Sequence, residues 1–383
     1  MNVLYLVESA APYGSNKSLV DLIDRVSMEG VTACVVGTHR GPLSDWLEER
    51  HVQYIALGHQ LSVYPKAGSW LDTFLFLPKL FAVRALNLFA FARLLAIAHR
   101  FKPDIIHTNI GPCTLGFWTA TTLGVRHVWH LREYQDRDFG LRVFPTKAIF
   151  INLLRRSDAV VCITRDIAKH FSYPGNLHIV ADGVAAERLK WQPARKRQRF
   201  LFVGRLEEAK GIGPLVSTFL EFCERHGPSF ELLVAGDGES VFVKRLKDEA
   251  LQSRHGSRVQ FLGYREDVAQ LMETARALIV NSRSEGFGRI TCEAMLNGCL
   301  VIGRDTGGTS EILDSGSGDP AGLLFSNEAG LMQAMVRATT MPDTEYERLA
   351  RRASARVMDH YSIEKHAKAM LEVYKLVDKP GPR

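Results

Sequence analysis

The sequence has 383 residues, of which 46% are hydrophobic and 23% are charged. This length exceeds one typical domain, and the composition is that of a globular protein with two cores, which excludes a largely disordered chain. The 48 Lys and Arg residues against 42 Asp and Glu give a net charge of +6. This balance favours an anionic ligand or membrane surface, but it is too weak for the basic stripe of a nucleic-acid-binding protein.

The chain begins MNVLYLVESAAPYG, with no basic residues before its short apolar run, which predicts a first strand rather than a signal peptide. Its six cysteines are scattered, without a CxxC or Cys/His ligand spacing. This pattern predicts the reduced, buried cysteines of a cytoplasmic protein rather than disulfides or a zinc site.

The first half alternates short apolar runs with helical periodicity. Leu19, Leu22, Ile23 and Val26 recur at i, i+3, i+4 and i+7, which predicts one face of a helix. Strand–helix alternation implies a parallel, doubly wound sheet with ligand sites at the carboxyl ends of its strands. The predicted strands are Asn2–Val7, Ala33–Gly37, Gln53–Leu57, Asp104–His107, His127–Leu131 and Ala159–Ile163.

A basic stretch, Pro193–Arg199, interrupts this pattern and is interpreted as the region of an interdomain linker. The alternation then restarts, so the predicted fold class is α/β, with Rossmann-like domains at residues 1–190 and 198–362. A final helix over 363–378, with Ser362 as its N-cap, is predicted to pack back on the first domain. The second set of predicted strands is Phe200–Gly204, Glu231–Gly236, Val259–Gly263, Ala277–Ser282, Leu300–Gly303 and Gly322–Phe325.

The segment Ser69–Arg100 is rich in Phe, Leu and Ala, with basic residues spaced through it. No window reaches the roughly 20 uncharged residues that a transmembrane helix needs. Two interpretations remain open: buried core helices, or a surface that enters the membrane interface with its arginines on anionic headgroups.

The most informative stretch is Asn281–Leu300, NSRSEGFGRITCEAMLNGCL. A strand, a glycine-bearing loop and a helix start follow one another here, which favours an anion such as phosphate at the helix N-terminus. Glu285 and Glu293, with seven residues between them, would repel a bare phosphate but accept hydrogen bonds from the hydroxyls of sugars attached to it.

The Glu-x7-Glu arrangement in SEGFGRITCEAM resembles the signature of the retaining GT-B glycosyltransferases of family 4. The resemblance implies two Rossmann-like domains facing each other across a cleft, with Glu285 near the transferred sugar and Glu293 on the ribose of the nucleotide. FVGRLEEAKG, from Phe202, resembles the family's strand followed by an Arg and a Lys that clamp the diphosphate. The donor-binding residues implied are Arg205, Lys210, Phe287, Gly288, Arg289, Ile290 and Glu293.

The first half resembles the family less closely. Gly14, Ser15 and Asn16 stand where family members carry a Gly-Gly pair, and the resemblance makes them acceptor-binding, with Ser15 preserving a serine-capped helix start. His107 matches a strand-end histidine of the family, and both an acceptor contact and a purely structural role remain open. His130, in HVWHLREY, matches the histidine near the reacting carbon and is a predicted catalytic residue with Glu285.

The resemblance implies transfer of a hexose or N-acetylhexosamine, with retention, from a UDP- or GDP-linked donor to a lipid-linked saccharide in surface polysaccharide synthesis. The implied mechanism is a front-face substitution without a metal or other cofactor, and the lone Asp136-Arg137-Asp138 is interpreted as a polar loop. The expected location is cytoplasmic, peripheral on the inner membrane, and no nucleic-acid partner is expected. A nucleotide-sugar epimerase on the same scaffold and a non-catalytic sugar-nucleotide-binding protein remain alternatives.

Overall fold

The chain forms two compact units in a computed structural model that describes residues 1–65, 70–172, 175–185, 196–314 and 318–379. Unit 1 comprises Met1–Gly183 and Ile363–Arg383, and unit 2 comprises Val184–Ser362. The predicted linker lies outside the described residues at 193–195. Its last residues differ from the prediction, because Arg197 to Arg199 open the first strand of unit 2, where Arg199 Nε lies 2.9 Å from Glu231 Oε2.

Unit 1 is built on a seven-stranded parallel sheet in the order β3-β2-β1-β5-β6-β8-β9. Each apolar run predicted in the first half is one of its strands, and the short β9 adds an edge. The bounds are β1 Asn2–Leu6, β2 Thr32–Gly37, β3 Gln53–Ala56, β5 Ile105–Thr108, β6 Arg126–Leu131, β8 Ala159–Cys162 and β9 Leu177–Ile179. A separate antiparallel pair joins β4 (Val63–Pro65) to β7 (Leu141–Val143).

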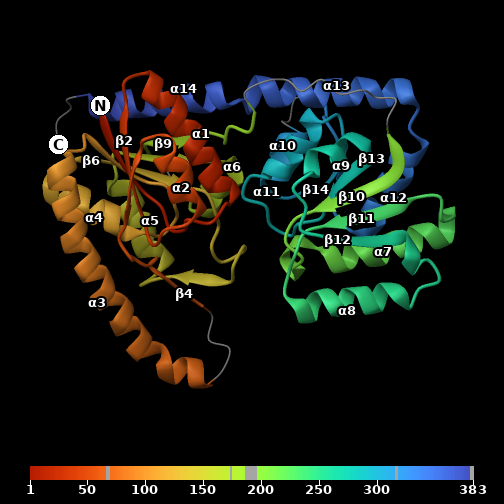
Figure 1. The fold of residues 1–383 in the computed structure, drawn as a ribbon, viewed down its shortest axis with the longest axis horizontal. Helices are drawn as coiled ribbons and strands as arrows, with labels where there is room; N and C mark the ends of the chain where they lie inside the picture. The colour runs from red at the N-terminus through yellow and green to blue at the C-terminus, as the bar shows by residue number, and fades with distance from the viewer. Residues whose placement is uncertain (66–69, 173–174, 186–195, 315–317, 380–383) are drawn as a thin grey trace. The chain divides into compact units, whose positions relative to one another are not determined.

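Helices cover both faces of this sheet (Figure 1). The four apolar residues that predicted the first helix are fully buried in α1, and α14 packs beside α1, with Met370, Val373 and Tyr374 in the same core. The opposite face is covered by α3 and α4. The bounds are α1 Gly14–Met28, α2 Pro42–Glu48, α3 Trp70–Phe101, α4 Thr114–Leu123, α5 Lys147–Arg156, α6 Arg165–His170 and α14 Ile363–Asp378.

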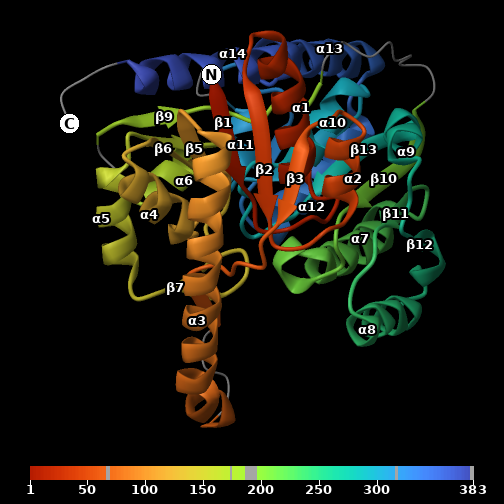
Figure 2. The ribbon, with the colours of Figure 1, turned by 60° about the vertical axis from the view of Figure 1, so that its left-hand side comes forward.

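The segment Ser69–Arg100 forms a single long helix, α3, preceded by Ser69, which lies outside the described residues. Its C-terminal part packs in the core of unit 1 through Ala90, Leu94 and Ala98, and the earlier part of the helix extends away from the body of that unit (Figures 1 and 2). The buried-core interpretation is therefore wrong for Leu77–Phe89, where most side chains are exposed. By length and composition alone, Leu77–Phe101 is apolar enough to cross a membrane, because an 18-residue window within it has a mean hydropathy of 1.8, and 11% of that window is buried.

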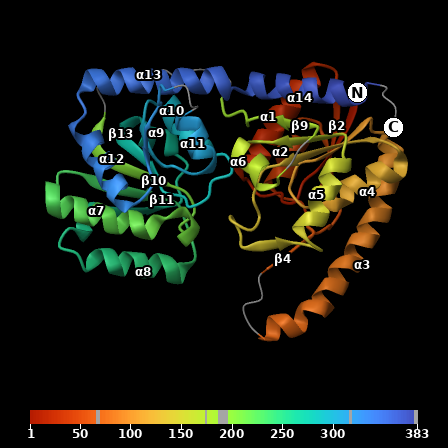
Figure 3. The ribbon, with the colours of Figure 1, turned by 180° about the vertical axis from the view of Figure 1, so that it is seen from behind.

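Unit 2 repeats the architecture around a six-stranded parallel sheet in the order β12-β11-β10-β13-β14-β15. Its strands are β10 Arg197–Val203, β11 Glu231–Ala235, β12 Val259–Gly263, β13 Ala275–Val280, β14 Leu300–Arg304 and β15 Leu323–Phe325. The helices are η2 Glu208–Lys210, α7 Ile212–His226, α8 Ser240–Leu251, η3 Gly256–Arg258, α9 Val268–Thr274, α10 Arg289–Leu296, α11 Gly307–Leu313, α12 Glu328–Thr340 and α13 Asp343–His360. These helices, among them α7, α9, α10 and α13, surround the sheet (Figure 3).

The strand order of each sheet indicates where a ligand site is expected. In unit 2 the order reverses between β10 and β13, and in unit 1 between β1 and β5. The loops that leave such neighbouring strands diverge, so a crevice for ligand opens beyond their carboxyl ends. In unit 2 these loops are 204–211 and 281–288, which hold most of the predicted donor-binding residues.

Candidate active site

The centre of the predicted donor site is an ion pair between Lys210 and Glu285. The Lys210 Nζ donates to Glu285 Oε2 at 2.9 Å, although 75 residues separate them, because β10 and β13 are neighbours in the sheet. The side chains are 26% and 17% exposed, so the pair is half-buried but open to a ligand. A lysine ammonium has three donors, so Lys210 can hold Glu285 and still bind an anion.

A hydrogen bond and a close backbone approach hold the two strand ends together behind this pair. Asn281 Nδ2 donates to the carbonyl of Gly211 at 2.8 Å. Gly211 has φ +67°, and a Cβ there would lie 2.2 Å from the carbonyl oxygen of Asn281. Only glycine therefore allows the loop after β10 to pack directly on the end of β13.

The predicted anion cradle is the start of α10. Gly288, at φ +97°, turns the chain into this helix without a side-chain cap, and the first turn begins at Arg289 and Ile290. The leading N–H groups of a helix lack partners within it and carry partial positive charge. The structure thus places a helix N-terminus three residues after Glu285.

The loop that carries Glu285 rests on the start of α11. Gly308 N donates to the Glu285 carbonyl at 2.9 Å, and a Cβ on Gly308 would lie 2.0 Å from the Phe287 carbonyl oxygen. Phe287 itself is buried and meets the ring of Tyr361 edge-on. Phe287 therefore anchors the loop through its side chain, and the start of α11 holds the backbone of the loop at Glu285.

The remaining donor-binding candidates carry weaker internal contacts. Arg205 is 54% exposed and pairs with Glu207 at 3.1 Å rather than with Glu285. Glu293 is 40% exposed and lies 3.9 Å from Arg289 Nε, at the limit of an ion pair. Side chains held this loosely can turn to a ligand at small cost in free energy.

In the described part of the chain, no group of three or more His, Cys, Asp or Glu side chains is placed to hold a metal ion. Asp138 Oδ2 accepts a hydrogen bond from the Tyr134 amide at 2.7 Å, whereas Asp136 lies 3.1 Å from His170 Nε2. The two aspartates of the Asp-x-Asp loop thus have different partners. The six cysteines are free and buried, as predicted.

Comparisons with known proteins agree with this geometry. The family profile described as Glycosyl transferases group 1 matches residues 184–355, and the one described as Glycosyltransferase Family 4 matches residues 14–188. The chain belongs to the family 4 glycosyltransferases. It is 26% identical over 245 residues to the lipopolysaccharide core biosynthesis mannosyltransferase LpsB of Rhizobium meliloti, covering 58% of this chain and 67% of that protein. It is 28% identical over 302 residues to a glycogen synthase of Mycobacterium tuberculosis, covering 74% and 71%.

Solved structures show the same GT-B fold. Anabaena HepE in complex with UDP and glucose matches with a TM-score of 0.76 at 20% identity, over 97% of this chain and 99% of that one. The apo form of the lipopolysaccharide outer core galactosyltransferase WaaB matches with a TM-score of 0.71 at 16% identity, over 98% and 99%. These likenesses establish the fold of the glycosyltransferase.

The two predicted histidines of the glycosyltransferase are both fully buried in unit 1. His107 Nδ1 lies 2.6 Å from the Tyr374 hydroxyl of α14, and its ring is 5.3 Å from that of His130. For His107 this geometry accords with the structural role. Neither ring nitrogen of His130 has a hydrogen-bond partner among the described residues, an uncommon state for a buried polar group. Burial, with the charge of Arg132, holds the pKa of His130 well below its usual range, so the ring is neutral.

The start of α1 differs from the prediction. Tyr13, not Ser15, is the N-cap, and no side chain caps the helix. Asn16 is buried, and its Nδ2 donates to the carbonyls of Ser9 at 2.7 Å and Ala11 at 2.8 Å. The serine-capped start is therefore wrong, and the Asn16 amide instead holds the loop after β1 in shape. Acceptor binding by Gly14, Ser15 and Asn16 stays a prediction.

Sequence reasoning missed a buried ion pair at the end of unit 1. Arg132 Nη1 donates to both carboxylate oxygens of Asp182, at 2.7 and 2.8 Å, and the side chains are 2% and 4% exposed. Arg132 Nε donates to Asn109 Oδ1, and the Ser18 hydroxyl donates to Asp182. Through these contacts Asp182 is connected to α1, by Ser18, and to the loop after β6, by Arg132. Arg132 is connected in turn to the loop after β5, by Asn109. The only sequence signal of the pair is the Asp182-Gly183 turn.

Another buried charged group at this edge of the sheet is Glu133, which follows β6 and which its position after His130 predicts to line the same site. Burial, with the charge of Glu8, raises the pKa of Glu133 to about 7, and Gln135 Nε2 donates to its Oε2 at 2.9 Å. Glu8 itself has a raised pKa from burial. Two carboxyl groups near the carboxyl ends of β1 and β6 therefore share a poorly solvated environment.

Proposed function

We propose that this glycosyltransferase is a retaining enzyme that moves a hexose or N-acetylhexosamine from a UDP- or GDP-sugar to a lipid-linked saccharide. The observation that supports the donor half is the Lys210–Glu285 pair at the switch point of unit 2, beside the N-terminus of α10. A cation, a carboxylate that can accept from sugar hydroxyls and a helix N-terminus in one place match the chemistry of a sugar diphosphate. Structures of HepE with UDP-glucose provide a related precedent.

In the proposed reaction the bond between the anomeric carbon and the diphosphate oxygen breaks, and the acceptor oxygen bonds to that carbon on the same face. The acceptor proton passes to the leaving phosphate, so no protein carboxylate becomes covalently attached. Arg205, Lys210 and the amides of Arg289 and Ile290 stabilise the charge that develops on the diphosphate. Glu285 positions the sugar and Glu293 the ribose. No metal ion is required, because these cations and amides supply the neutralising charge.

A panel of UDP-, GDP- and ADP-sugars tests the donor half, with thermal stability and nucleoside diphosphate release as readouts. We expect one nucleotide class to raise the melting temperature of the wild type but not of Glu293→Ala, and its sugar to be transferred with the anomeric configuration unchanged in the NMR spectrum.

Excess EDTA is expected to leave turnover unchanged. Inversion would contradict retention, and a loss of turnover reversed only by added metal would contradict metal independence. Release of an altered sugar nucleotide without acceptor would identify the protein as an epimerase. Binding of a sugar nucleotide without any turnover would identify it as a non-catalytic binding protein.

The proposed acceptor half rests on α3 and on the relatives named for lipopolysaccharide synthesis. Leu77, Phe81, Leu88 and Phe89 of α3 are each more than half exposed, which is an unusually apolar surface for water. Lys79, Arg84 and Arg93 are interspersed along the same helix. Basic and apolar residues together suit a helix at the level of anionic headgroups. We therefore place the enzyme peripherally on the cytoplasmic face of the inner membrane, in O-antigen, capsule or exopolysaccharide synthesis.

Vesicle binding tests this membrane contact. The double variant Phe81→Asp/Leu88→Asp is expected to lower binding to phosphatidylglycerol vesicles at least about tenfold, because two large apolar side chains no longer enter the lipid. The matched control is Val241→Asp/Leu251→Asp on α8, whose side chains are each 71% exposed, like Phe81 at 72% and Leu88 at 71%. Equal cosedimentation of the α3 variant and the wild type would contradict the contact.

A further inference from the structure

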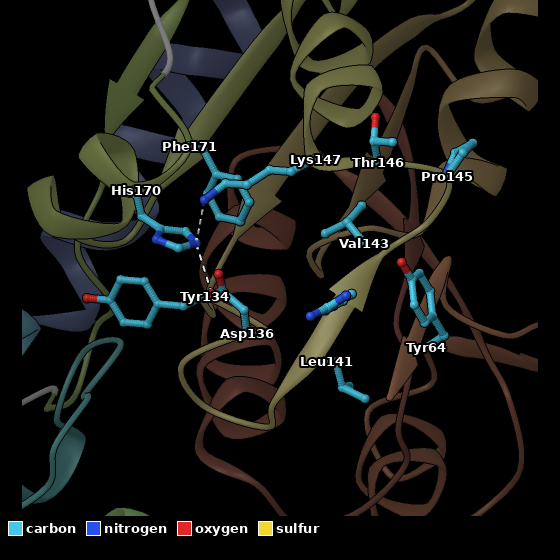
Figure 4. Close-up of a pocket in the computed structure, with 11 residues that line it drawn as sticks. Tyr64, Tyr134, Asp136, Leu141, Val143, Pro145, Thr146, Lys147, His170 and Phe171 are labelled. Carbon is cyan, nitrogen blue, oxygen red and sulfur yellow. Dashed lines mark hydrogen bonds and ion pairs between the residues drawn. The ribbon is translucent and has the colours of Figure 1, made fainter. Parts of the chain in front are cut away.

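Unit 1 contains a pocket that the predicted site residues do not use. It has a volume of about 250 Å³ and lies among the β4–β7 pair, the start of α5 and the end of α6 (Figure 4). Its walls are largely apolar and aromatic, with Tyr64, Val143 and Phe171 among them. Because α5 leads into β8, the N-terminus of α5 lies on the side of the sheet where the strands end, the side on which parallel sheets bind ligands.

Two cations line this largely apolar pocket. Arg142 comes from β7, and within the described chain no carboxylate lies within 4.0 Å of its guanidinium. Lys147 is the first residue of α5, where the helix N-terminus adds partial positive charge. Arg142 and Lys147 thus give the pocket two positive charges against the single carboxylate of Asp136.

The contacts of Lys147 leave donors free for a ligand. Lys147 Nζ lies 2.9 Å from His170 Nε2, and Asp136 Oδ1 lies 3.1 Å from the same nitrogen (Figure 4). One imidazole nitrogen either accepts from the lysine or donates to the aspartate, but not both. His170 therefore occupies at most one of the three N–H donors of Lys147. Burial lowers the pKa of His170, which keeps the ring neutral at pH 7.

Apolar surface continues from the pocket towards α3. Phe144, the residue after β7, meets the ring of Tyr64 edge-on, with centroids 6.1 Å apart, and carries the Arg84 guanidinium of α3 at 4.3 Å from its centroid. Phe139 and Ile149, which flank the β7 and α5 lining segments, are each 45% exposed. A basic pocket is thus joined to the exposed apolar helix of the same unit.

We propose that this pocket binds the phosphorylated end of an isoprenyl or similar long-chain lipid carrier. Arg142 and Lys147 hold the phosphate or diphosphate, and the first carbons of the chain lie against the aromatic walls and pass towards α3. The assignment rests on the proposed function, because it names the class of acceptor that the glycosyltransferase uses. It specifies that recognition begins at the lipid phosphate rather than at the saccharide alone.

Titration calorimetry with farnesyl diphosphate, inorganic pyrophosphate and farnesol tests the pocket in the full-length protein. We expect farnesyl diphosphate to bind more tightly than either part, and Arg142→Ala and Lys147→Met each to weaken it at least about tenfold, as for a charge-assisted contact. Arg155→Ala, in the last turn of α5, is the matched control and is expected to bind like the wild type. Pyrophosphate that binds only to the donor site of unit 2 would be insensitive to both pocket variants, so its binding is measured in the same proteins.

Two outcomes would overturn the assignment: equal farnesyl diphosphate binding by the wild type and both pocket variants, or pyrophosphate binding as tight as farnesyl diphosphate with the same losses, which would mark a simple anion site. Nucleotide binding in unit 2 is measured in parallel. Lipid binding that is unchanged in Arg142→Ala and Lys147→Met, with intact nucleotide binding, refutes the pocket alone. Absent nucleotide binding with intact lipid binding refutes the proposed donor chemistry instead.

Discussion

Replacing Lys210 by alanine is expected to lower the turnover of sugar transfer by about 100- to 1,000-fold. Lys210 is the cation that contacts Glu285 directly, and no other described basic side chain pairs with that carboxylate. Without it, charge on the departing diphosphate loses its nearest ammonium, and Glu285 loses the contact that orients it. Because the pair is half-buried, its loss is expected to reduce the free energy of unfolding by only about 1 kcal/mol or less.

The measurement is the rate of nucleoside diphosphate release with the donor that the panel identifies, together with the melting temperature. Lys244→Ala, an exposed lysine on α8, is the matched control and is expected to keep wild-type turnover. Glu285→Gln keeps the shape of the partner but removes its charge, and we expect a comparable loss of rate. Near-normal turnover in Lys210→Ala, with a lower melting temperature, would show that the pair is structural and would refute the donor site.

The contact at the centre of the proposed donor site was predictable from sequence, because its residues directly follow two neighbouring strands. A run of apolar residues fixes where β10 and β13 end, and the residues that follow must meet if these strands are neighbours at a switch point. Lys210 and Glu285 meet in this way at 2.9 Å. The family resemblance named the two residues, and the parallel sheet supplies the physical reason for their contact. Arg205 was named by the same pattern, yet its side chain turns to Glu207, since local contacts of an exposed arginine leave no sequence signal.

Other features lay beyond sequence patterns for identifiable reasons. The strands β4 and β7 have three residues each, too few for a period to appear. The exposure of α3 was not predictable either, because an apolar helix has the same composition whether protein or lipid covers it. The pocket of unit 1 depends on the two short strands, because β4 and β7 form one of its walls. Its lining residues come from four separate segments, which only the fold brings together.

The Arg132–Asp182 pair was likewise not predicted, because its members are 50 residues apart and no motif links one to the other. Its expected effect on stability is nevertheless large, because its side chains are the least exposed of any ion pair in the part of the chain that the structure describes. In Asp182→Ala the Arg132 guanidinium stays buried without its carboxylate, and breaking such a pair costs about 3–5 kcal/mol. Arg132 Nη2 already lacks a partner among the described residues, so the loss falls on a group that is incompletely satisfied.

Urea unfolding followed by tryptophan fluorescence measures this cost selectively. Unit 1 contains Trp46, Trp70, Trp118 and Trp129, and the remaining tryptophan is Trp191, so the signal reports mainly on unit 1. Asp182→Asn retains the shape and one acceptor oxygen, and its effect is expected to lie between those of the wild type and Asp182→Ala. The control is Asp24→Ala, which breaks the Asp24–Arg50 pair on the surface of the same unit, where both side chains are 39% exposed.

The control is expected to cost about 1 kcal/mol or less, as is usual for a surface pair. The variant Arg132→Met/Asp182→Leu removes both charges together, so its loss is expected to be smaller than the sum of the two single losses. Equal effects of Asp182→Ala and Asp24→Ala would mean that water reaches Arg132 in solution, and that the bidentate pair does not hold the end of unit 1. A large loss in Asp182→Ala that Arg132→Met partly restores would instead establish that the unpaired charge, rather than the missing side-chain volume, destabilises the fold.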